Sequence, residues 1–128
     1  MNKMSGNEHH KKIAVEFLQY VIKGKIDEAY EKFVDLKGKH HNVFFPAGFP
    51  TLLKAMKDAH AQFPKKQFAI KKVLGDNNMV AVHSHLILQK GKDMVVVHMF
   101  RFNKNKIVEM WDCGQEIPAN SPNTDGAF

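Results

Sequence analysis

The spacing of hydrophobic residues changes once along this chain, from a helical repeat to an alternation. Before Pro64 the apolar residues recur every three or four positions, as on one face of an α-helix. From Gln67 they alternate with polar residues, as in half-buried β-strands. Helices followed by a run of strands predict an α+β fold. The chain has 128 residues, which suits one domain over 1–128.

The helical part predicts a hairpin of two helices and then a third helix. The hairpin is expected over 7–36, with Asp27 as the cap of its second helix. Residues 39–49 have no clean period and are expected to form a loop or a short extended segment. The third helix is expected over 51–63, with Thr51 as its cap.

The alternating part predicts four consecutive antiparallel strands within 67–113, connected as a meander. Turn residues at 75–78, 90–93 and 103–106 separate the strands. We expect this sheet to curl around the N-terminal helices and to leave a cavity. The polar segment 116–128 is expected to be a tail that lies over the pocket or across a partner subunit.

The last two predicted strands combine an apolar face with two groups that can exchange protons. Side chains two positions apart share a face, so one face of each strand carries the sets Val96, His98, Phe100, Phe102 and Val108, Met110, Asp112. An otherwise apolar surface therefore carries one imidazole and one carboxylate. Glu109, on the opposite face, is expected to form an ion pair with Arg101.

This hairpin also resembles a known family. The run Phe100-Arg101-Phe102, a turn, Lys106-Ile107-Val108-Glu109-x-Trp111-Asp112-x-x-Gln115 and then Ile117-Pro118 is similar to the C-terminal half of the SnoaL-like polyketide cyclases. These cyclases belong to the nuclear-transport-factor-two-like superfamily. His40-His41-Asn42 and Val82-His83-Ser84-His85 resemble further motifs of that family. The resemblance implies a cone-shaped α+β domain that needs no metal and no organic cofactor.

Asp112 and His98 are the candidate catalytic residues. The resemblance implies that Asp112 is the acid/base group and that His98 contacts the substrate. Loss of water around a carboxyl on an apolar face favours its neutral form, which suits proton transfer near neutral pH. An imidazole can donate a hydrogen bond to a carbonyl as enolate charge develops. Two structural alternatives stay open: Asp112 as a strand-end cap, and His98 as a core residue bonded to a backbone carbonyl.

Five further residues are candidates for contact with a substrate. His83 and His85 share a strand face, where two imidazoles could converge on a metal ion, but no third ligand is evident. We expect instead that one of them lines the pocket. His41 is expected at its rim, and Met110 and Phe100 on its apolar wall.

Composition narrows the possible partners. The formal charge is +6, yet Arg101 is the only arginine, and the lysines are scattered. This pattern argues against nucleic-acid recognition, which relies on clustered cations and bidentate arginine contacts. The single cysteine, Cys113, excludes an internal disulfide and is expected to be a small buried residue. No apolar run suits a membrane span or a secretory signal, so a cytoplasmic protein is expected.

Two functions are consistent with this sequence. One is an enzyme that removes a proton next to a carbonyl in a small apolar substrate, for aldol cyclisation or isomerisation. The other is a non-catalytic domain of the same fold that binds a small molecule. In both cases a homodimer is expected, because Val95, Val97 and Met99 would otherwise form an exposed apolar face.

Overall fold

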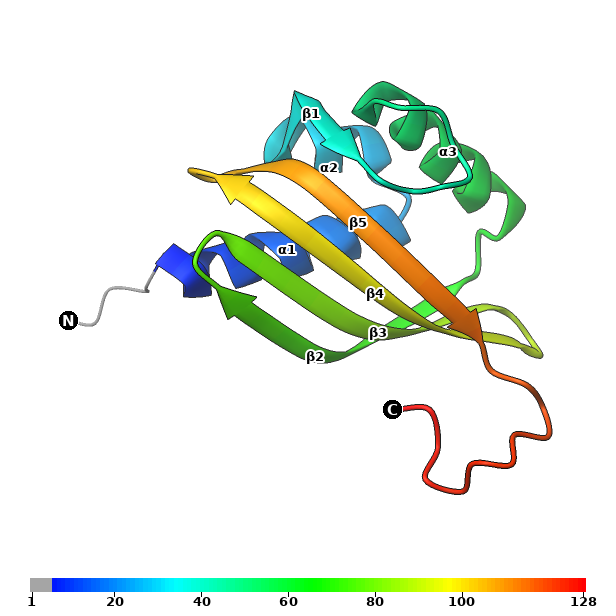
Figure 1. The fold of residues 1–128 in the computed structure, drawn as a ribbon. Helices are drawn as coiled ribbons and strands as arrows, with labels where there is room; N and C mark the ends of the chain where they lie inside the picture. The colour runs from blue at the N-terminus through cyan, green and yellow to red at the C-terminus, as the bar shows by residue number, and fades with distance from the viewer. Residues whose placement is uncertain (1–5) are drawn as a thin grey trace.

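The computed structural model describes residues 6–128, which form three helices and five strands (Figure 1). In chain order the elements are α1 (Gly6–Ile22), α2 (Ile26–Phe33), β1 (Val34–His40), α3 (Phe49–Gln62), β2 (Gln67–Asp76), β3 (Met79–Gln89), β4 (Lys92–Asn103) and β5 (Lys106–Glu116). The strands form one open sheet in the order β1-β5-β4-β3-β2. β1 runs parallel to β5, and all other neighbours are antiparallel. The predicted cone-shaped α+β fold is confirmed.

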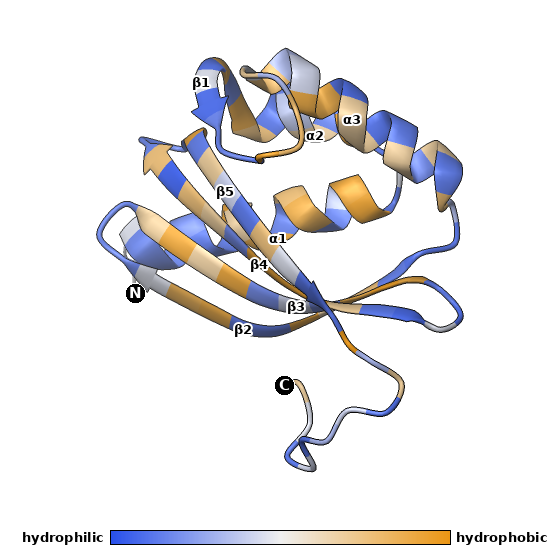
Figure 2. Cartoon of the chain, turned by 45° about the vertical axis from the view of Figure 1, so that its right-hand side comes forward, coloured by the Kyte–Doolittle hydropathy of each residue, from blue (hydrophilic) through white to orange (hydrophobic). Residues whose placement is uncertain are grey.

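The three helices lie on one side of the curved sheet, as Figures 1 and 2 show. α1 packs on β2 and β3, whereas α3 packs on β1 and α2. α1 turns one apolar stripe inward, formed by Ile13, Ala14, Phe17 and Leu18. The chain leaves α1 through Gly24, whose φ of +82° favours glycine, and the Lys25 amide closes the end by bonding to the Tyr20 carbonyl.

A row of edge-to-face aromatic rings joins the helices to the sheet. Phe17 of α1 contacts Phe100 of β4 at a centroid distance of 5.8 Å and Tyr30 of α2 at 5.5 Å. Tyr30 in turn contacts Phe49 of α3 at 6.0 Å. All four rings are almost completely buried. We call Phe100, Phe17, Tyr30 and Phe49 the aromatic row, and it fixes the positions of all three helices over the sheet.

The segment after α2 differs from the prediction. The helical hairpin was expected to reach residue 36, but the helix ends at Phe33 and the chain becomes extended at Val34. β1 then pairs with β5, whose edge supplies hydrogen bonds that a longer helix could not use. The predicted helix caps are also wrong: Lys25 precedes α2, and Gly48 precedes α3, which starts at Phe49 with Pro50 in its first turn.

A bulge at Val108 sets the register of β5. Arg101 pairs with Glu109, whereas Phe102 pairs with Ile107, so Val108 is the extra residue. Ile107 is therefore fully buried, and Val108 leaves the inner face on which it was predicted. A Cβ atom on Gly38 of β1 would clash with the Val108 carbonyl oxygen, so this close approach requires glycine.

The C-terminal tail lies against the outer face of the sheet. β5 extends to Glu116, and the chain beyond it turns back so that the ring of Phe128 lies 5.6 Å from that of His83 and 4.6 Å from that of His85. The alternative in which the tail covers the pocket is therefore wrong. Within residues 6–128, no helix combines the length and the apolar character needed to cross a bilayer.

The aromatic row predicts a large effect of truncating Phe17. Phe17→Ala removes a fully buried ring that contacts two elements, so the free energy of unfolding should fall by about 3–5 kcal/mol. Chemical denaturation measures this change. Phe45→Ala is the control, because that ring is 43% exposed and its loss should change stability little. Equal losses in the two variants would contradict this account of the core.

Candidate functional site

A pocket of about 510 Å³ opens between the helices and one end of the sheet. Its wall is mainly apolar and includes Leu18, Val21, Ile22, Met56, Phe68, Leu86, Leu88, Met94 and Val96. The side chains that bring polar groups to it are Asn42, Lys66, His98, Asp112 and Glu116. A pocket with an apolar wall and a few polar groups is typical of small-molecule sites.

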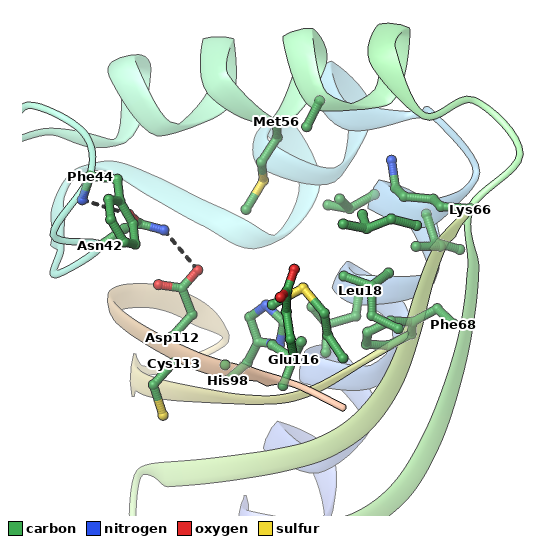
Figure 3. A pocket seen from close by; sticks show the side chains of 18 of the residues that line it. Leu18, Asn42, Phe44, Met56, Lys66, Phe68, His98, Asp112, Cys113 and Glu116 are labelled. Carbon is green, nitrogen blue, oxygen red and sulfur yellow. Dashed lines mark hydrogen bonds between the residues drawn. The ribbon is translucent and has the colours of Figure 1, made fainter. Parts of the chain in front are cut away.

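Asp112 and His98 meet in this pocket. They are directly paired residues of β5 and β4, and both side chains line the cavity, where Figure 3 shows them close together. The alternation of the two strands indicated this arrangement, and the bulge at Val108 lies too early in β5 to disturb it. Asp112 is half-buried and therefore reaches the cavity from a partly desolvated position.

His98 is held among aromatic rings and carries little charge near neutral pH. Its ring stacks on Phe100 at 6.1 Å and contacts Phe68 at 6.3 Å. Burial lowers the pKa of His98, and the nearby negative charge of Asp112 opposes this shift only in part. Its Nδ1 atom is buried and has no hydrogen-bond partner among the described residues. No bond at Nδ1 therefore fixes which ring nitrogen carries the proton.

Asn42 orients the carboxylate of Asp112, which sequence reasoning did not anticipate. The Asn42 Nδ2 donates a hydrogen bond of 3.0 Å to Oδ2 of Asp112 (Figure 3). The Asn42 Oδ1 accepts a bond of 3.0 Å from the Phe44 amide and so closes a local turn. The family resemblance included Asn42, but no spacing in the sequence linked it to a residue 70 positions later.

His40 anchors the loop that carries Asn42. The buried His40 ring accepts the Asn42 amide at Nδ1 over 3.1 Å and donates from Nε2 to the Pro46 carbonyl over 2.9 Å. This pair of bonds defines a neutral imidazole with its proton on Nε2. At the tip of the same loop, Val43 and Phe44 line the pocket yet are 88% and 85% exposed.

Tyr30 lies behind the pocket wall. Burial, and secondarily the charge of Asp112, raise the pKa of Tyr30 far above its ordinary value, so the phenol stays protonated. Its hydroxyl donates to the Sδ atom of Met56 over 3.2 Å. A thioether is a weak acceptor. Tyr30 is therefore a neutral phenol whose hydroxyl makes only a weak hydrogen bond, to Met56.

His41 does not line the pocket. Its ring stacks on Trp111 at 5.1 Å, and its Nε2 lies 2.6 Å from Oε2 of Glu109. Arg101 Nε donates to the other carboxylate oxygen over 2.8 Å, which confirms the predicted pair of Arg101 and Glu109. The hydrogen bonds from His41 and then Arg101 hold the pKa of Glu109 below its ordinary value. This cluster fastens the loop to the sheet.

The other four predicted contact residues also lie outside the cavity wall. His83 and His85 are on the outer face of β3 beside Phe128, and His85 Nε2 lies 2.8 Å from Asp93 Oδ2. Phe100 and Met110 are in the core, at 0% and 1% exposure, and support the pocket from behind.

Cys113 is exposed, because β5 points it away from the helices, so the prediction of a buried thiol is wrong. Within residues 6–128 no group of three or more histidine, cysteine, aspartate or glutamate side chains lies close enough to hold a metal ion.

Comparison with solved structures identifies the fold family of this architecture. No family model and no curated protein matches the sequence. The structure is similar to an NTF2-like protein of unknown function from Burkholderia xenovorans LB400, with a TM-score of 0.71 and 17% identity over 90% of this chain and 88% of that one. This chain has the nuclear-transport-factor-two-like fold.

Two other solved structures share this fold. AclR from Streptomyces galilaeus, a proposed hydroxylase, has a TM-score of 0.73 at 17% identity, over 88% of this chain and 91% of that one. A proposed polyketide cyclase from Acidithiobacillus ferrooxidans has a TM-score of 0.69 at 18% identity, over 88% and 91% of the two chains. At these identities the likeness establishes the NTF2-like fold and leaves the reaction to be argued from the pocket.

The lowered pKa of His98 predicts a stability that falls as the solution becomes mildly acidic. In the unfolded chain a histidine takes up a proton near pH 6.5, whereas folded His98 resists it. The protein therefore takes up a proton when it unfolds, so the free energy of unfolding should decrease as pH falls below about 6.5. Glu109, whose folded pKa is depressed, should add a further loss only below its ordinary value of 4.5.

Denaturation of His98→Gln between pH 7.5 and 5 measures the contribution of His98. The variant should lose less stability over this range than the wild type. His9→Gln is the matched control, because His9 is exposed on α1 and its removal should leave the wild-type slope intact. A slope unchanged by His98→Gln would show that His98 is not held neutral by burial.

Proposed function

We propose that this domain is a cofactor-independent enzyme that removes a proton from the carbon next to a carbonyl group. The observation that supports this proposal is the direct pairing of Asp112 with His98 at an otherwise apolar pocket. A carboxylate can act as the base, and a neutral imidazole can donate to the carbonyl oxygen as negative charge develops there. The substrate class is a small apolar molecule with an enolisable carbonyl.

The groups around Asp112 suit this role. Asn42 occupies Oδ2 of Asp112 and leaves Oδ1 without a hydrogen-bond partner in the described part of the chain. An oriented carboxylate with one free oxygen can take a proton from a substrate carbon and return it elsewhere. After proton transfer the enolate carbon either attacks a second carbonyl, as in aldol cyclisation, or is protonated at another position, as in isomerisation. Neither route needs a metal ion or an organic cofactor.

Exchange of α-protons tests the proposed enzyme directly. A panel of enolisable ketones and β-keto esters in D₂O should lose α-proton NMR signals faster with the protein than without it. Asp112→Asn keeps the size of the side chain but removes the base, so exchange should slow by about 100-fold to 10,000-fold. Asp93→Asn is the matched control, because Asp93 bonds to His85 outside the pocket. Full activity in Asp112→Asn would refute the role of Asp112.

A small-molecule binding domain without catalysis is the second candidate. It is favoured by the hydrogen bond from Asn42 to Asp112, because an amide donor stabilises the charged carboxylate and satisfies one of its oxygens without any substrate. On this view the panel compounds bind in the pocket but exchange no faster than in buffer.

We also propose that two copies of the chain associate through the outer face of the sheet. Val95, Val97 and Met99 of β4 and Trp111 of β5 form an apolar surface there, and Met99 is 36% exposed. An apolar sheet face of this kind usually contacts a partner. The cytoplasm remains the compartment that we propose for this assembly.

Sedimentation analysis tests the dimer. Met99→Lys places a charge in the proposed contact, so the protein should shift from dimer to monomer. Leu74→Lys is the control, because Leu74 is 65% exposed on the far strand β2 and should leave the dimer intact. A wild-type protein that sediments as a monomer at all concentrations would contradict the dimer.

A further inference from the structure

Lys66 is the only cation among the residues that line the pocket. It lies in the tight turn between α3 and β2, where its amide bonds to the Phe63 carbonyl over 3.3 Å. Figure 3 shows Lys66 and Asp112 on opposite sides of the cavity, with Met56 above the space between them. The pocket therefore has a cation on one side and the Asp112 carboxylate on the other, with the Glu116 side chain between them in this view.

The ammonium group of Lys66 has no acidic partner. Its hydrogen-bond partner is a ring nitrogen, Nδ1 of His60, at 3.4 Å, and no carboxylate in residues 6–128 forms an ion pair with it. Lysines on the surface, such as Lys54 and Lys57, do have aspartate partners. Lys66 is also half-buried, and this burial lowers the pKa of its ammonium group because part of its hydration is lost. An anion placed beside Lys66 would replace the lost interactions.

Neither of the two acidic residues of the pocket pairs with the ammonium group of Lys66. Asp112 lies across the cavity and is bonded to Asn42, and Glu116 is exposed at the end of β5. Their negative charges repel an anionic group from the rest of the pocket, so they restrict such a group to the side of Lys66.

We propose that the ligand of this pocket is an amphiphilic carboxylic acid, whose carboxylate pairs with Lys66 and whose apolar body fills the cavity toward Asp112. This orientation rests on the proposed function. Together they identify the substrate as an oxo acid, with its enolisable carbonyl at Asp112 and its carboxylate at the other end. A charge-assisted hydrogen bond at one end then sets which carbon faces the base.

A competition experiment isolates the effect of the carboxylate. The neutral fluorophore N-phenyl-1-naphthylamine reports occupancy of the pocket, and decanoate and 1-decanol compete for it at pH 8, since they differ only in the head group. Lys66→Gln should weaken the binding of decanoate by about fivefold to tenfold and leave the affinities for decanol and for the fluorophore unchanged. Lys65→Gln is the matched control, because it removes the same charge from an exposed neighbour that does not line the pocket.

Methyl NMR shows where decanoate binds. The Met56 and Met94 methyl groups line the cavity, whereas Met99 is on the outer face of the sheet. Decanoate should shift the first two signals and not the third. The proposal is overturned if Lys66→Gln binds decanoate as tightly as the wild type does, or if Lys65→Gln loses as much affinity for decanoate as Lys66→Gln. It is also overturned if decanoate shifts the methyl signal of Met99 alone.

The same experiment separates this inference from the proposed function. Binding of decanoate does not require the base, so Asp112→Asn should retain the preference for decanoate over decanol. Proton exchange without that preference would overturn only the role of Lys66. The preference without any proton exchange would overturn only the enzymatic role of Asp112.

Discussion

The aromatic row is the contact on which the rest of the structure depends. Its four rings come from β4 and from each of the three helices, and they are packed edge to face in the centre of the core. Because Phe100 is two residues from His98 on the same face of β4 and stacks on its ring, the row lies directly beside the pocket. The helices are thus held over one part of the sheet and held away from the other, and the cavity is the space that remains.

Local sequence patterns predicted the parts of the fold that depend on local periodicity. The alternation after Gln67 located the four antiparallel strands. Because alternate residues of a strand share a face, it also placed His98 of β4 and Asp112 of β5 on one face. The alternation alone does not show which face of a strand turns toward the helices. On β3 both faces carry apolar residues, such as Leu86 and Ile87. One of His83 and His85 was therefore expected in the pocket, although both lie outside it.

What the sequence did not reveal depends on contacts between distant segments. β1 has buried residues only at Val34 and His40, its two ends, because it is an edge strand defined by the sheet beside it. Asn42 reaches Asp112 only after β1 has brought its loop alongside β5. Lys66 is one of many lysines in the sequence, and only the fold separates it from the solvated ones.

The double role of Asn42 ties the mouth of the pocket to its acidic group. One side chain closes the turn that carries the exposed Val43 and Phe44 and also donates to Asp112. Any displacement of this loop would therefore also remove the amide donor from the Asp112 carboxylate. The exposed rim of the pocket and the orientation of its carboxylate thus depend on one side chain.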